Sequence, residues 1–354
     1  MDRHLEAVSQ KYGIHFEGVD AQLQRGEKER GGLLAMDAQP ELVTMSNSGI
    51  PAFLSTFIDP KTIQIAITPN KATKIVGLES KKGDWTLETA MFPVVEYTGV
   101  VSSYGDYSKN GVSGANVNWV QRQSYTYQTF FECGERELEK MGLARISFAN
   151  EKRNAAVSTL DKFQNKTYFF GVEGLANYGL LNDPSLVAPI APVAVTGSAG
   201  SVLVTWAQKG TDTNAPQWVY NDVRALYQQL VSQANGIVEL NMESPMTLAL
   251  STESQMYLTY TNPTFATNVI DMLKKNFPNL KVEVAVEYGT ASGNLVQLIV
   301  DEYDGVRTAT TAFTEKLRAH RMVYEDSSYR QKMSQGSWGT IISRPVLIAS
   351  MLGV

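Results

Sequence analysis

The strongest periodic pattern in the sequence lies between residues 146 and 170. Apolar side chains recur there every three or four residues, which predicts a long helix with one buried face. Gly171 and Gly174 follow directly and end the helix. The residues expected on its buried face are Ile146, Ala149, Ala156, Leu160, Phe163, Thr167 and Phe170.

A different pattern, with a period of two, covers residues 116–131. Apolar and polar side chains alternate there, which predicts a strand. A second strand is predicted at residues 91–97, where Pro93 favours the edge of a sheet. Between them, residues 102–114 are mostly glycine and small polar residues, so we expect a mobile tip. Together these segments predict a long β-hairpin at about residues 92–128.

This predicted hairpin is too narrow to enclose a core of its own. A two-stranded hairpin is marginally stable in water, and ordering it costs conformational entropy. Docking on a partner would offset that cost. We therefore expect the hairpin to contact another subunit.

The N-terminal residues 1–60 lack a regular pattern. A short helix with Leu5 and Val8 on its inner face is predicted at residues 2–11, and glycines and prolines then interrupt the chain. Such a stretch is typical of an arm lying on another surface. That surface could belong to a second subunit or to its own domain, and the sequence leaves both open.

Five lysines against one acidic residue mark residues 61–82. They favour either a weak phosphate-facing patch or a solvated strand and turn, and both interpretations stay open. The lysines are Lys61, Lys71, Lys74, Lys81 and Lys82, and the acidic residue is Glu79.

Beyond residue 216 the pattern is that of a sheet flanked by helices. A helix that begins at Asn214-Ala215-Pro216 buries Val219, Val223, Leu226 and Leu230. Strands are predicted at 237–240, 246–250, 282–286 and 295–300, with a helix at 262–278. Three short strands are predicted at 328–333, 338–343 and 346–351. The fold class expected is α+β.

Composition narrows the function. Only 19% of the 354 residues are charged, and a low charge fraction suits large contact surfaces because interface cores are depleted in charge. The net charge of -5 argues against a protein whose main task is to grip nucleic acid. The single cysteine, Cys133, excludes an intrachain disulfide framework. We find no signal peptide pattern and no apolar run of the length that a membrane span needs.

The sequence shows no recognisable catalytic motif. The three histidines, His4, His15 and His320, have no metal-ligand spacing, and neither a phosphate-binding loop nor a nucleophile elbow occurs. We therefore expect no catalytic, cofactor-binding or metal-binding residues. The enzyme alternative would need an active site assembled from distant residues such as Glu135, Asp301 and His320.

Several stretches resemble the Hong Kong 97-type major capsid proteins of tailed phages. The most specific is the run of residues 174–184, in which Gly179-Leu180-Leu181-Asn182 follows the predicted long helix. The ending Arg344-Pro345 after a strand fits the same family. Further likeness lies in residues 113–122, 134–139 and 163–168.

The resemblance implies an order of parts. It implies an N-terminal arm at residues 1–60 and a peripheral domain at 61–215, which contains the E-loop hairpin (about 92–128) and the spine helix (about 146–170). An α+β axial domain at 216–322 and C-terminal strands at 323–354 that return to the peripheral domain complete the expectation.

The resemblance also implies a function and partners. The chain is expected to be a structural subunit that forms hexamers and pentamers in an icosahedral shell around phage double-stranded DNA. The alternative is an encapsulin-like compartment that encloses a protein cargo. About 35 residues precede the likeness, too few for a fused scaffold, so a separate scaffolding protein is expected. A portal, decoration proteins and weak non-specific contact with DNA are further expected partners. No membrane partner is expected, and assembly is expected in the bacterial cytoplasm.

The contact residues expected from this reasoning lie in and beside the hairpin tip. A bond between Lys109 and a neighbour's asparagine, as some members of the fold form, would need a buried carboxylate that the sequence does not place. A solvated turn is the alternative there. The residues expected to touch a neighbouring subunit are Tyr104, Asp106, Tyr107, Lys109, Asn110, Asn116 and Trp119.

Overall fold

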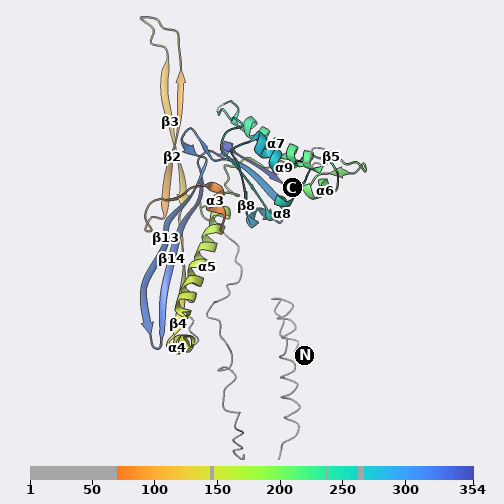
Figure 1. Cartoon of the computed structure of the whole chain (residues 1–354). Helices are drawn as coiled ribbons and strands as arrows, with labels where there is room; N and C mark the ends of the chain where they lie inside the picture. The colour runs from red at the N-terminus through yellow and green to blue at the C-terminus, as the bar shows by residue number, and fades with distance from the viewer. Residues whose placement is uncertain (1–69, 144–146, 237, 262–266) are drawn as a thin grey trace, which may run out of the picture. The chain divides into compact units, whose positions relative to one another are not determined.

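A computed structural model describes residues 70–143, 147–236, 238–261 and 267–354. These residues form a four-stranded and a five-stranded sheet, both with helices packed on them, and three two-stranded sheets (Figure 1). This is the expected α+β class. The arm predicted at residues 1–60, with its helix at residues 2–11, lies outside the described residues.

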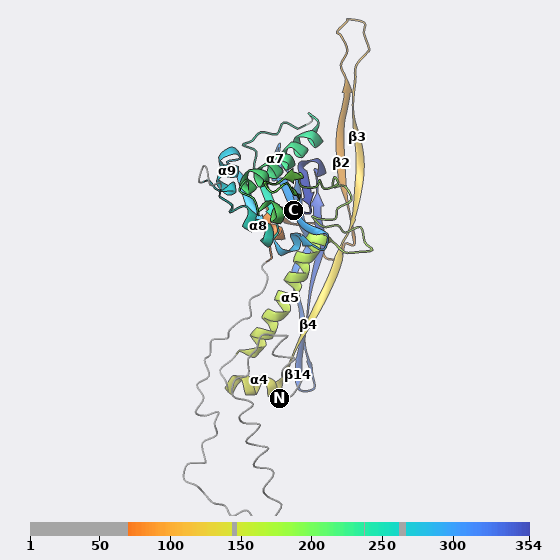
Figure 2. The same cartoon turned by 90° about the vertical axis from the view of Figure 1, so that its right-hand side faces the viewer.

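The first sheet has four strands in the order β1-β13-β14-β4. β14 runs antiparallel to both of its neighbours, and β1 is parallel to β13. The long helix α5 lies along β4 and β14, as Figures 1 and 2 both show. The bounds are β1 (Glu79–Lys81), β4 (Tyr125–Gly134), α4 (Glu135–Leu143), α5 (Phe148–Phe170), β13 (Ala309–Glu325) and β14 (Ser328–Ile342).

The second sheet has five strands. Its main path is β15-β10-β7-β8, and β9 pairs with β10. β7 and β8 are parallel, and the other pairs are antiparallel. Its elements are α7 (Ala215–Ala234), β7 (Met246–Leu250), α8 (Thr252–Tyr257), α9 (Val269–Asn276), β8 (Leu280–Val284), β9 (Gly289–Thr290), β10 (Gly293–Val300) and β15 (Ile348–Leu352).

Alternation along β10 explains why this sheet is buried on both faces. Val296, Leu298 and Val300 join the core beneath α7, whereas Leu295 and Ile299 join a second core on the opposite face. This second core also receives the C-terminal end of α5, α3, and residues of β13 and β14, so it ties the two sheets together. Shorter elements are α3 (Ala72–Val76), β5 (Val195–Thr196), β6 (Val202–Leu203), α6 (Trp206–Lys209), β11 (Glu302–Tyr303) and β12 (Val306–Arg307).

The predicted hairpin is present, but its second arm ends earlier than expected. β2 (Thr89–Val100) pairs with β3 (Val112–Gln123), and we call this pair the ribbon. Residues 116–131 are not one strand. The strand is interrupted at Ser124, and the following strand, β4, pairs with β14 instead. The backbone explains the break, because the Gln123 N–H donates to the Ala176 carbonyl and the Ser124 N–H to that of Glu88.

The buried face of α5 differs from the predicted one. Leu160 is 2% exposed and Ala156 is 7% exposed, and Ala149 is partly buried. Phe163 and Phe170, however, are 39% and 43% exposed, so their assignment to the core is wrong. Ile146 lies outside the described residues.

Polar residues take the inward positions in the second half of α5. Gln164, Thr167 and Tyr168 continue the stripe from Leu160 at spacings of three and four, and all are buried. Each makes a hydrogen bond: Gln164 to the Tyr168 hydroxyl, Thr167 to the Phe163 carbonyl, and Tyr168 to Glu79. The burial of Thr167 confirms its predicted place on the inner face, whereas the pattern of apolar residues does not place Gln164 or Tyr168 there.

The C-terminal strands also depart from expectation. Residues 328–333 and 338–343 are predicted as two strands but belong to the single strand β14, whose polar Ser334, Gln335 and Ser337 are buried. β13, expected within the axial unit, pairs with β14. The C-terminal strands are expected to return to the peripheral domain. This is wrong for β15, which pairs with β10 in the five-stranded sheet.

We predict that substitutions at buried and at exposed positions of α5 differ in their effect on the stability of the subunit. Leu160→Ala should lower the free energy of unfolding by about 2–5 kcal/mol, because it leaves a cavity in a buried site. Phe163→Ala should cost only about 1–2 kcal/mol, because the ring keeps solvent contact. Lys162→Ala, on the exposed side, should change stability within about 0.5 kcal/mol. Urea denaturation of the unassembled subunit measures all three. An equal loss from Phe163→Ala and Leu160→Ala would contradict the observed orientation of the helix.

Candidate assembly interface

The ribbon exposes apolar side chains on both faces. Tyr97 is 88% exposed, and Val101, Tyr104 and Tyr107 are more than 90% exposed. Within the described residues no third strand pairs with the ribbon (Figure 1). Large exposed apolar patches are typical of interaction surfaces. The other exposed apolar residues along it are Met91, Val94, Val95, Val100, Val112, Val117, Trp119 and Val120.

The tip of the ribbon is a small hydrogen-bonded turn. The Ser108 N–H donates to the Gly105 carbonyl at 2.8 Å, and the Ser102 hydroxyl donates to the Asn110 carbonyl at 2.7 Å. The Tyr104 hydroxyl donates to an Asp106 carboxylate oxygen at 2.9 Å. Every residue of the tip from 101 to 111 is exposed.

Five of the seven predicted contact residues lie together at this tip. They are Tyr104, Asp106, Tyr107, Lys109 and Asn110. The other two lie along β3, where Asn116 is opposite Glu96 and Trp119 is opposite Pro93. The carboxylate within the tip, that of Asp106, is exposed, so the tip itself does not supply the buried carboxylate that a lysine–asparagine bond would need.

The root of the ribbon, by contrast, is buried. Arg122, near the end of β3, forms an ion pair with Asp183 at 2.6 Å, and both side chains are at most 7% exposed. The guanidinium carbon lies 4.7 Å from the centroid of the Tyr178 ring. Asp183 also accepts hydrogen bonds from the N–H and the hydroxyl of Ser185. Sequence reasoning missed this pair, because 61 residues separate its members.

The turn that carries Asp183 is itself bonded to three other elements. The Asn177 amide donates to the carbonyls of Gln123 and Ser337, which belong to β3 and β14. The Asn182 amide donates to the Phe170 carbonyl at the end of α5. The motif at residues 174–184 therefore joins the ribbon, the long helix and the four-stranded sheet.

Glycine is required at two close approaches in this region. A β-carbon at Gly179 would lie 2.2 Å from the Phe169 carbonyl carbon, and one at Gly339 would lie 2.2 Å from the Tyr178 carbonyl oxygen. Gly339 also has a φ of +74°, which disfavours other residues. The backbone of the turn packs directly on α5 and β14, which fixes its position.

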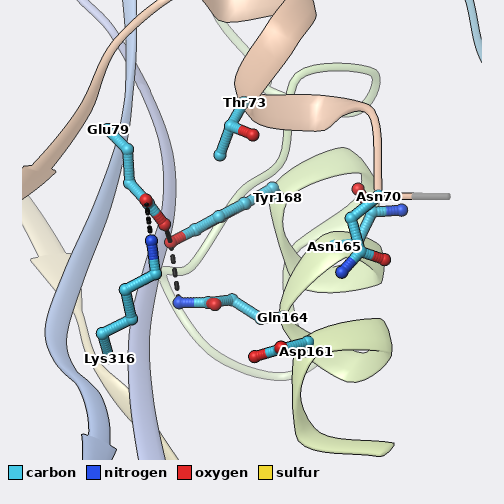
Figure 3. A pocket seen from close by; sticks show the side chains of 8 residues that line it. All are labelled: Asn70, Thr73, Glu79, Asp161, Gln164, Asn165, Tyr168 and Lys316. Atoms are coloured by element: carbon cyan, nitrogen blue, oxygen red, sulfur yellow. Dashed lines mark hydrogen bonds and ion pairs between the residues drawn. The ribbon is translucent and has the colours of Figure 1, made fainter. Parts of the chain in front are cut away.

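A polar cavity of about 180 Å³ lies between α3, α5, β1 and β13 (Figure 3). Glu79 accepts from the Lys316 ammonium at 2.5 Å and from the Tyr168 hydroxyl at 3.1 Å. Burial, together with the nearby Glu79 charge, raises the pKa of Tyr168 above its usual value, so its hydroxyl stays protonated and donates. The Gln164 amide donates to that hydroxyl at 2.8 Å. This network holds α5 to the sheet.

The residues named for the enzyme alternative each engage different partners. Glu135 accepts from Tyr324, Asp301 from Thr247 and Lys281, and His320 shares a hydrogen bond with Ser334. Among the residues that the structure describes, no group of three or more acidic, histidine or cysteine side chains is placed to hold a metal ion. In the same part of the chain, no helix is long and apolar enough to span a membrane.

Solved capsid structures share this fold. The capsid of the myovirus XM1 aligns with a TM-score of 0.64 at 10% identity, over 86% of this chain and 99% of that one. The capsid of a native GTA particle aligns with a TM-score of 0.60 at 10% identity, over 88% and 98%. A structure from Mycobacterium phage Ogopogo aligns with a TM-score of 0.54 at 10% identity, over 84% and 96%. The likeness establishes the Hong Kong 97-type fold.

The family comparison establishes more than the fold. No curated protein sequence matches the chain. The model of the Pa193 gp26 major capsid protein family, however, matches residues 41–353, which is most of the sequence. A family of shell-forming proteins accounts for the exposed ribbon and its buried root. The chain therefore belongs to the Pa193 gp26 major capsid protein family and is a structural subunit of a virion capsid, not an enzyme.

Proposed function

We propose that the ribbon is the element through which neighbouring subunits join into hexamers and pentamers of an icosahedral shell around phage double-stranded DNA. The observation that carries the proposal is the contrast along the ribbon. Its tip and strands expose apolar side chains, whereas its root is fixed by a buried ion pair.

A projecting element on one subunit must meet a different surface on the next. Such a heterologous contact closes into a ring when the rotation between subunits closes, and rings of five and six then cover a shell. A contact repeated in every subunit can be weak individually and still hold the shell. The low charge of the chain suits broad contacts, since charged residues are depleted from interface cores.

The cargo and the other partners are further parts of this proposal. The description as a major capsid protein favours a phage shell over an encapsulin-like compartment. The net charge of -5 supports weak, non-specific contact with the packaged DNA. A separate scaffolding protein, a portal and decoration proteins complete the proposed set of partners, with assembly in the bacterial cytoplasm.

Shortening the ribbon tests this role. Val100 and Val112 are paired across the ribbon, so an Asn-Gly turn in place of residues 101–111 would close the hairpin with its register intact. We expect the unassembled variant to melt at the temperature of the wild type, because no residue of the tip belongs to a hydrophobic core of the described chain. Electron microscopy and sedimentation should show no closed shells. A second variant, Tyr104→Ser with Tyr107→Ser, keeps the length and tests the side chains alone. Shells of normal yield from both variants would exclude the tip as the contact.

The root of the ribbon gives a separate prediction. Arg122→Ala should lower the free energy of unfolding by about 3–5 kcal/mol, because it leaves the Asp183 carboxylate buried without its partner. The exposed pair between Arg330 and Glu325, 4.0 Å apart, provides the control. Glu325→Gln should cost at most about 1 kcal/mol. Denaturation in urea measures both, and a similarly small effect of Arg122→Ala would show that the pair does not fix the ribbon.

A further inference from the structure

The tip of the ribbon contains a chemically reactive pair, Asn110-Gly111. We propose that Asn110 of the unassembled subunit is a site of spontaneous modification and converts through a cyclic imide into aspartate and isoaspartate. The inference concerns the chemistry of the tip and does not depend on what the tip contacts.

The reaction is balanced without any oxidant or reductant. The Gly111 amide nitrogen attacks the side-chain carbonyl carbon of Asn110, a carbon–nitrogen bond forms, and the side-chain nitrogen leaves as ammonia. Water then opens the ring at either carbonyl: its hydroxyl joins the carbon and its hydrogen returns to the nitrogen. One opening gives aspartate. The other gives isoaspartate, in which the main chain runs through the former side chain. Each event consumes one water and releases one ammonia.

The geometry of the tip favours the attack. Asn110 is exposed, and Gly111 carries no β-carbon to obstruct the closing ring. Within the described residues, the Gly111 N–H has no hydrogen-bond acceptor that would hold it away. The hydroxyl of Ser102 donates to the Asn110 carbonyl at 2.7 Å, which draws electron density from that peptide bond. The Gly111 N–H is therefore more acidic and more readily forms the attacking anion.

The sequence supplies an internal control. It contains one other Asn-Gly pair, Asn235-Gly236, which is also exposed. Asn235 is the C-cap of α7, however, held in the left-handed region with its N–H bonded to the Ser232 carbonyl. The end of the helix restricts the rotation that brings the next nitrogen onto the side chain. No donor in the described residues polarises the Asn235 carbonyl.

The product changes the tip in two ways. Either product adds a negative charge close to Asp106 and Lys109, and isoaspartate also lengthens the main chain by one carbon. If the tip contacts a neighbour, as the proposed function holds, assembly should cover Asn110 and slow the reaction. Subunits left unassembled would then accumulate altered tips.

The test follows the peptides around both asparagines in the purified full-length subunit. Samples are held unassembled at several pH values, digested, and analysed by mass spectrometry with separation of aspartate from isoaspartate. We expect conversion severalfold faster at Asn110 than at Asn235, with a rate that rises with pH because the deprotonated amide attacks. An unmodified Asn110, or equal rates at the two sites, would overturn the proposal.

A comparison of variants at two neighbouring serines distinguishes the effect of the Ser102 hydrogen bond from the effect of exposure alone. Ser102→Ala should slow the reaction at Asn110 severalfold, whereas Ser103→Ala, one residue away, should leave the rate unchanged. Equal rates in both variants would contradict the role of Ser102. Closed shells give a further comparison. Conversion as fast in shells as in free subunits would contradict the proposed tip contact while leaving the chemistry of Asn110 intact.

Discussion

The buried ion pair between Arg122 and Asp183 is the interaction on which the rest of the structure depends. A two-stranded ribbon has no core of its own, so its outer part cannot set its direction. Direction comes instead from the root, where the guanidinium lies against Tyr178 and the carboxylate is held by the turn after α5. Because that turn is also bonded to β14 and to the end of α5, the ribbon is fixed to the four-stranded sheet and to the long helix.

This arrangement separates folding from assembly. The apolar surface that stabilises the subunit lies in the cores on either face of the five-stranded sheet and beneath α5. The apolar side chains of the ribbon belong to none of these three cores. Only Ala90 and Phe92, near its base, pack on a smaller cluster that contains Trp338. Surface of this kind is available for association. A subunit built in this way can fold first and bind afterwards, as a shell made of many copies requires.

Periodicity predicted most of the elements but not how they are oriented or paired. The three- to four-residue spacing found α5 and α7, and alternation found the ribbon. Alternation could not show the break at Ser124, because both sides of it alternate and only hydrogen bonds to Ala176 and Glu88 divide them. Phe163 is misplaced because the polar Gln164 takes the inward position one turn after Leu160. The partner of Arg122 could not be found from spacing, because the fold brings the two residues together over 61 positions.

A density map of the assembled particle, determined by electron cryomicroscopy, tests the central claim most directly. The account predicts that the ribbon crosses onto a neighbouring subunit and that Tyr97, Tyr104 and Tyr107, all nearly fully exposed in the single chain, become covered there. It also predicts that Arg122 and Asp183 remain paired at the root. A closed shell in which the ribbon stays surrounded by solvent would contradict the account.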